Sequence, residues 1–159
     1  MLLMSLLGAV GNSYSSVAIV ARDWRGTVVL AVSQKVNTTI PLQAEAEAIA
    51  WASRIAANLG VDQICIESDS KTCMDHIRGA VQNFPWRISH LLVDLLALAA
   101  THPCWSFAWV NREANHASHE LAGWSLRNRF WSSFDISFGP FCFVNACLVD
   151  QLGVLSLLL

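Results

Sequence analysis

The sequence predicts a mixed α/β fold, and three observations support this prediction. Several short segments alternate apolar and polar residues, which is typical of strands half buried in a sheet. The first of these segments follow one another directly, as in a hairpin meander, whereas the later ones are separated by helical segments. A meander followed by strand–helix units predicts a mixed sheet with helices on its faces.

The first third of the chain is expected to form three strands and then a helix. The apolar N-terminus supplies the first strand, and residues 15–34 form two more around a turn at 23–26, where glycine permits a tight backbone. Residues 41–60 form an alanine-rich helix. Pro41 suits its first turn and Gly60 suits its end.

The remaining segments alternate between strand and helix. A strand is expected over 61–68, and a short helix over 70–80. A longer helix is expected within 84–102, a strand over 105–111 and a closing helix over 113–128. The predicted order is therefore β-β-β-α-β-α-α-β-α.

Composition narrows the classes of function. The chain has 159 residues, is 54% hydrophobic and only 14% charged, and carries a formal net charge of −2. This balance argues against a strongly electropositive nucleic-acid footprint. The five cysteines are odd in number and include no CxxC pair, so they are expected to be reduced and mostly buried, in a cytoplasmic or nuclear protein. Most of the seven tryptophans are expected in the core, although tryptophans also supply surfaces for base stacking.

Both ends of the chain are apolar, and neither matches a targeting or spanning segment. The N-terminal run is short and lacks a basic region before it, unlike a signal peptide. The C-terminal run is interrupted by Asn145, Asp150 and Gln151, so no transmembrane span is expected. A surface-docked or loosely ordered tail is the expectation.

Two carboxylates are candidates for a metal site. Glu45 shares a helix face with Ile49 and Ala52, so it is expected to face the sheet. Asp69 follows the strand that contains Ile66, at the strand end where α/β folds place ligands. Two hard oxygen ligands suit Mg²⁺. The alternative is that Glu45 is an ordinary first-turn acid and Asp69 a turn residue.

A pair of histidines is a further candidate. His116 and His119 lie three residues apart at the start of the closing helix, a spacing that permits metal binding. The alternative is that both are ordinary histidines at the protein surface.

Four short motifs, in order, resemble the ribonuclease H-like domain of plant retroelement-derived proteins. They are "RDWRG", "AEAEAIAWA", "IESDS" and "WVNREANHASHELA", and the resemblance spans roughly residues 5 to 128. It implies a ribonuclease H-like fold, a five-stranded mixed sheet flanked by helices. It also implies nucleic acid as the partner, no small-molecule cofactor, and Mg²⁺-dependent cutting of the RNA strand of an RNA–DNA hybrid. In that reaction one ion activates a water and another stabilises the leaving oxygen.

The resemblance implies three catalytic, metal-binding residues in this chain, Glu45, Asp69 and His119. The wider superfamily has Asp at the last position, whereas plant members of this type often carry His. The main departure is at Leu7, which stands where the family has the Asp of an Asp-Gly-Ala element. Leucine cannot coordinate a metal, so hydrolysis is expected to be weak or absent.

The motifs also suggest a domain boundary. Residues 1–131 are expected to form the ribonuclease H-like domain, and residues 132–159 an apolar tail outside the core fold. The expected function is nucleic-acid binding of the ribonuclease H type. The alternative is a decayed domain that acts as a protein-interaction module.

Overall fold

The computed structural model describes residues 1–80, 83 and 85–156, with side chains as far as residue 149. A five-stranded sheet with the order β3-β2-β1-β4-β5 forms its centre. The strands are β1 (Leu2–Val10), β2 (Ser15–Arg22), β3 (Val28–Val36), β4 (Ile64–Ser68) and β5 (Trp105–Trp109). The first three pair antiparallel, and β4 lies parallel to both β1 and β5. The predicted mixed sheet is therefore confirmed.

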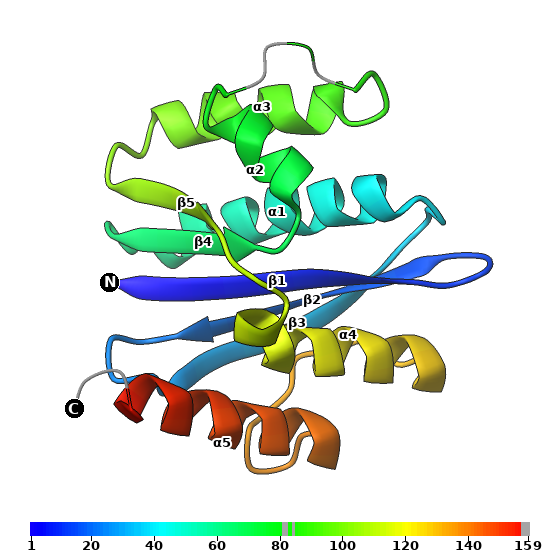
Figure 1. Ribbon diagram of the computed structural model, residues 1–159, viewed down its shortest axis with the longest axis vertical. Coiled ribbons are helices and arrows are strands. Elements are labelled where there is room, and N and C mark those ends of the chain that lie inside the picture. Colours follow the sequence, from blue (N-terminus) through cyan, green and yellow to red (C-terminus); the bar gives the residue numbers. More distant parts are fainter. Residues whose placement is uncertain (81–82, 84, 157–159) are drawn as a thin grey trace.

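Helices cover both faces of the sheet, as Figure 1 shows. They are α1 (Pro41–Leu59), α2 (Lys71–Ile77), α3 (Ser89–Ala100), α4 (His116–Asn128) and α5 (Phe141–Ser156), with a 3-10 turn at Glu113–Asn115. The first three helices lie on one side of the sheet, and α4 and α5 lie on the other (Figure 1). This arrangement makes three layers with an apolar core on each side of the sheet.

Strand β2 shows why both cores form. Val17 and Ile19 pack into the core under α1 and α3, whereas Ala18 and Val20 pack into the core under α4 and α5. Every residue of β2 is buried, because alternate side chains of a strand point to opposite faces and helices cover both.

Local signals placed several boundaries correctly. The helix α1 begins at Pro41, and the residue after it, Gly60, has a φ of 61°, the left-handed conformation that favours glycine. In the turn between β2 and β3, Asp23 Oδ1 accepts hydrogen bonds of 2.9 Å from the backbone N–H groups of Arg25 and Thr27.

Three other elements are shorter than predicted. The strand expected over 61–68 begins only at Ile64, and the strand expected over 105–111 ends at Trp109. The helix expected within 84–102 begins at Ser89, because Pro85 starts a turn in which the Ile88 N–H donates to the Pro85 carbonyl. Residue 84 itself lies outside the described residues.

The expectation that most tryptophans are in the core is wrong. None of the seven is fully buried, and Trp24 and Trp86 are 72% and 75% exposed. Both lie in loops, where the neighbouring Arg25 and Arg87 place their guanidinium groups 4.6 and 4.5 Å from the ring centroids. At this distance each guanidinium makes a cation–π interaction with an exposed indole ring.

The five cysteines form no disulfide, and the expectation that most of them are buried is wrong. Cys73 and Cys147 are buried, Cys65 and Cys142 are half-buried, and Cys104 is exposed.

The C-terminal segment packs on the domain as a helix. Phe143, at the start of α5, is fully buried in the core under α4 with Val20 and Leu121. Before α5, the chain contacts edge strand β3, where the Ser132 carbonyl accepts from the Ser33 N–H at 2.9 Å. Residues 157–159 of the predicted tail lie outside the described residues, and the boundary after residue 131 stays a prediction. Within the part of the chain that the structure describes, no helix is long and apolar enough to cross a membrane.

Candidate functional site

The three predicted site residues line one cavity of about 500 Å³. It lies where β1, the N-terminal part of α1, the end of β4 and one side of α4 meet. The lining residues are Leu7, Gly8, Ala9, Val10, Pro41, Glu45, Asp69, Arg112, His119, Gly123, Leu126 and Arg127. Leu7 is 2% exposed, so an apolar side chain fills the place beside the two carboxylates.

Glu45 reaches this cavity because α1 lies very close to β1. The Gly8 N–H donates a hydrogen bond of 3.0 Å to Oε1 of Glu45, and the Ser68 hydroxyl donates one of 3.5 Å to Oε2. A Cβ on Gly8 would lie 3.2 Å from both Ala44 Cβ and Glu45 Oε1, closer than most such contacts. Glycine at this position therefore permits the contact between helix and strand.

Burial changes the protonation of Glu45. Loss of solvent raises the pKa of this carboxyl from 4.5 to about 7, and the charge of Asp69 adds to the rise. The hydrogen bonds from Gly8 and Ser68 and the charge of Arg112 oppose it. A carboxyl that titrates near neutral pH is a feature of functional sites, although structural networks also produce it.

Asp69 stands at the carboxyl end of β4, and its backbone is anchored to the next strand. Its carbonyl accepts a hydrogen bond of 3.1 Å from Nε1 of Trp109. Burial raises the pKa of Asp69, and the Arg112 charge opposes the rise. The N-cap of α2 is Ser70, whose hydroxyl accepts from the Cys73 N–H. Asp69 is therefore not needed as the cap.

The neighbouring acid Glu67 points elsewhere. Its Oε2 accepts a hydrogen bond from the Ser5 hydroxyl at 3.4 Å, and it does not line the cavity. Of the two carboxylates at this strand end, only Asp69 belongs to the site.

His119 is held by a neighbouring arginine. Nη2 of Arg112 lies 3.1 Å from Nε2 and 3.2 Å from Nδ1 of the imidazole. A guanidinium only donates, so the ring accepts through its unprotonated nitrogen. Burial and then the Arg112 charge lower the pKa of His119, which favours its neutral form. Nε2 of His116 instead lies 3.8 Å from Oε1 of Glu120, and His116 does not line the cavity, so the candidate histidine pair does not meet there.

Sequence reasoning missed the two arginines of the cavity. Arg112 lies between β5 and α4, and Arg127 lies in the last turn of α4. Nη1 of Arg127 would be 3.1 Å from a Cβ on Gly123, so the absence of a side chain there leaves room for the guanidinium. The signal available in the sequence was a basic residue in the loop after a parallel strand, at the same sheet edge as Asp69.

The residues present do not fit a pair of metal ions. Leu7 offers no ligand, and both oxygens of Glu45 already accept hydrogen bonds. The Arg112 charge, next to His119, also repels a cation. Among the residues that the structure describes, no three His, Cys, Asp or Glu side chains are grouped to hold a metal.

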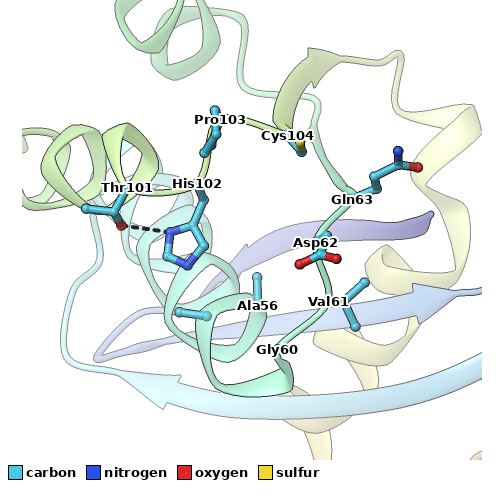
Figure 2. A pocket seen from close by; sticks show the side chains of 10 residues that line it. Ala56, Gly60, Val61, Asp62, Gln63, Thr101, His102, Pro103 and Cys104 are labelled. Carbon is cyan, nitrogen blue, oxygen red and sulfur yellow. Dashed lines mark hydrogen bonds between the residues drawn. The ribbon is translucent and has the colours of Figure 1, made fainter.

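A second cavity of about 500 Å³ lies at the other end of the parallel strands, where residues 61–63 and 101–104 meet (Figure 2). There His102 Nδ1 contacts the Thr101 hydroxyl at 2.9 Å, and its ring stacks on Trp105. Because α/β folds place ligands at the carboxyl ends of the strands, the cavity with Asp69 is the better candidate.

Comparison with known families agrees with the fold. A family model described as reverse transcriptase-like matches residues 8–125. A search of curated proteins found no match.

Solved structures share the architecture at low identity. The RNase H1 of the archaeon Halobacterium salinarum NRC-1 is 23% identical, with a TM-score of 0.74 over 80% of this chain and 98% of that chain. The N-terminal RNase H domain of rv2228c from Mycobacterium tuberculosis is 19% identical, with a TM-score of 0.72 over 80% and 94%. LC11-RNase H1 in complex with an RNA/DNA hybrid is 17% identical, with a TM-score of 0.74 over 81% and 99%. The fold is therefore ribonuclease H-like, as predicted.

Proposed function

The chain belongs to the reverse transcriptase-like family, and from this premise we propose that it is a nucleic-acid-binding domain of the ribonuclease H type with little or no hydrolytic activity. The observation that carries the proposal is the cavity in which Glu45, Asp69 and His119 meet beside Leu7. Those three residues are the proposed remnant of the catalytic and metal-binding set. Leu7 is the proposed position of the missing carboxylate.

An RNA–DNA hybrid is the proposed partner. One structure with the same fold, LC11-RNase H1, was solved with such a hybrid. The proposal includes descent from a plant retroelement, which rests on the order of the four motifs. A proposed cytoplasmic or nuclear location rests on five cysteines that form no disulfide.

Weak hydrolysis follows from the chemistry of the cavity. Cleavage by this family of reactions requires both the attacking water and the leaving oxygen to be stabilised. The apolar Leu7 side chain stabilises neither, and no pair of Mg²⁺ ions fits the remaining donors. Binding does not depend on the missing carboxylate, because phosphates are held by positive and hydrogen-bonding groups.

The test is a paired measurement of binding and cleavage on the full chain. A fluorescent RNA–DNA hybrid and a DNA duplex of the same sequence are titrated, and cleavage of the hybrid is followed with Mg²⁺ present. We expect preferential binding of the hybrid and cleavage near background. Rapid cleavage would contradict the inactive site, and equal or absent binding would contradict the proposed partner.

The surface of α5 favours a second candidate function, a protein-interaction module. On α5, Phe141 is 85% exposed, and Leu148 and Val149 are exposed too; Phe138, in the turn before the helix, is 91% exposed. Exposed apolar patches mark interaction surfaces more often than chance. This alternative would be favoured if the chain bound no nucleic acid but self-associated. The substitutions Phe138→Ser and Phe141→Ser should then make it monomeric.

A further inference from the structure

We propose that the cavity beside Glu45 binds a backbone phosphate of nucleic acid directly through Arg112 and Arg127, without a metal ion. This inference rests on the proposed nucleic-acid function and assigns the contact that replaces the missing metal site. It starts from the disagreement between the family's metal chemistry and the residues that this chain places in the cavity.

Arg112 supplies a positive charge where it acts on both carboxylates. Its charge is close enough to influence the ionisation of Glu45 and of Asp69. Its Nη2 rests against the His119 ring at 3.1 Å, which orders one side of the guanidinium. Arginine stays charged at all relevant pH values, and its other N–H groups remain available to form a fork for phosphate oxygens.

Arg127 supplies a second positive charge from the other end of α4. Its guanidinium folds back over Gly123 and lines the same cavity as Arg112. The two arginines thus approach one space from the loop before α4 and from its last turn. Paired arginines at one cavity match the several oxygens of a phosphate better than a single point charge does.

The charge balance of the cavity changes because Leu7 is neutral. The ionisable lining consists of two carboxylates, two guanidinium groups and one imidazole. The carboxylates and guanidinium groups cancel in formal charge, so the lining has no excess negative charge to attract a cation, and a phosphate is held by the directed N–H donors of the arginines. The Glu45 oxygens are also directed to the Gly8 N–H and the Ser68 hydroxyl, which satisfies that charge within the protein.

The apolar part of the lining strengthens a contact between arginine and phosphate. Leu7, Val10 and Leu126 form walls around the charged groups. Charge pairs interact more strongly in surroundings of low dielectric constant than in water. A cavity of about 500 Å³ also has room for a phosphodiester with part of its sugar.

The test measures hybrid binding by fluorescence anisotropy in EDTA and again in Mg²⁺, using the full chain at several salt concentrations. The variants are Arg112→Gln, Arg112→Lys and Arg127→Gln. The matched control is Arg54→Gln, an exposed arginine of α1 that lines a groove against α3 instead. Thermal melts followed by circular dichroism show whether each variant is folded. The formal net charge of −2 keeps the general attraction to nucleic acid small, so single arginines are measurable.

We expect the dissociation constant of the unmodified chain in EDTA to lie within about twofold of its value in Mg²⁺, because mass action links binding to a metal only if the metal is part of the site. Arg112→Gln should weaken binding roughly tenfold and reduce the slope of log K against log salt by about one. Arg112→Lys keeps the charge and should weaken binding less. Arg127→Gln should weaken binding as much as Arg112→Gln. The control should change neither quantity.

Two results would overturn this inference while leaving the proposed function in place. One is hybrid binding that appears only when Mg²⁺ is present. The other is an equal loss in the Arg112 and Arg54 variants. Binding of hybrid under neither condition would overturn the proposed function as well, so the two failures are distinguishable.

Discussion

The backbone N–H of Gly8 donates a hydrogen bond of 3.0 Å to Oε1 of Glu45 and so ties α1 to β1 beside Leu7. The contact joins residues 37 positions apart in the chain. It places the buried carboxyl of the candidate site directly next to the position where a carboxylate is missing. The first three predictions concern this corner of the molecule.

Leu7→Asp is expected to raise Mg²⁺-dependent cleavage of an RNA–DNA hybrid above the near-background level of the unmodified chain. The new carboxylate would stand beside Glu45 and Asp69 in the cavity. Because position 7 is buried, the free energy of unfolding should fall by about 2–4 kcal/mol. Cleavage is measured alongside a thermal melt, so that loss of fold is not mistaken for loss of chemistry.

Two controls accompany the Leu7→Asp variant. In Leu7→Asn the side chain has the shape of aspartate without its charge, so cleavage should not increase. Adding Asp69→Asn to Leu7→Asp should remove the increase in cleavage. A folded Leu7→Asp variant that binds Mg²⁺ yet cleaves no faster would show that position 7 is not the missing ligand.

Gly8→Ala is expected to destabilise the fold by about 1–3 kcal/mol, because the added methyl group meets Ala44 and Glu45 at 3.2 Å. The matched control is Gly123→Ala, where the added methyl group meets only the flexible end of Arg127. Alanine inside helix α4 should stabilise the protein by up to about 1 kcal/mol. Urea unfolding of both variants tests the pair, and equal effects would contradict the assigned role of Gly8.

Glu45→Gln is expected to change the pH dependence of stability. In the folded protein the pKa of Glu45 is about 7, above the value of 4.5 for an exposed glutamate. The folded state therefore holds a proton that the unfolded state releases, and stability falls as pH rises from about 4.5 to 7. Glutamine does not ionise, so the stability of the variant relative to the unmodified protein should rise by about 3 kcal/mol across this window and stay constant above it. If the stability curves of the two proteins ran parallel from about pH 4 to about pH 8, Glu45 would not have the raised pKa described.

Two phenylalanines in one segment should respond very differently to truncation. Phe143 is fully buried in the core under α4, whereas Phe141 is 85% exposed. Phe143→Ala should cost about 3–5 kcal/mol of unfolding free energy, because it leaves a cavity. Phe141→Ala should stay within about 0.5 kcal/mol. Similar losses in chemical denaturation would mean that α5 does not pack as described.

A chain that ends at residue 131 is expected to fold on its own, because all five strands and α1 to α4 precede that point. It loses Phe143 from one core and the hydrogen bonds that Ser132 and Phe134 make with β3, so its midpoint in urea should be lower. Circular dichroism and intrinsic fluorescence should still report one coincident transition. Separate or gradual transitions would place the domain boundary after α5 instead.

Much of the fold could be predicted from the sequence, because its signals are local. The alternation of Ile64 and Ile66 with polar neighbours marks a strand, and Pro41 and Gly60 mark the two ends of a helix. Helix periodicity predicted that Glu45 faces the sheet, and the position of Asp69 at the end of a strand predicted the same sheet edge; both residues line one cavity. Each of these inferences depends on backbone preferences within a few residues, which the sequence contains.

The tertiary structure alone decided which side chains from distant segments meet. Arg112 lies against His119 because a strand, a turn and a helix bring them to one cavity, and no spacing in the sequence indicates which way a loop arginine points. Phe143 is buried while Phe141 is exposed, although both are apolar and two residues apart. The tryptophans of the loops stay exposed for the same reason. Burial depends on what packs against a residue from elsewhere in the chain, and those long-range contacts form only when the layers assemble.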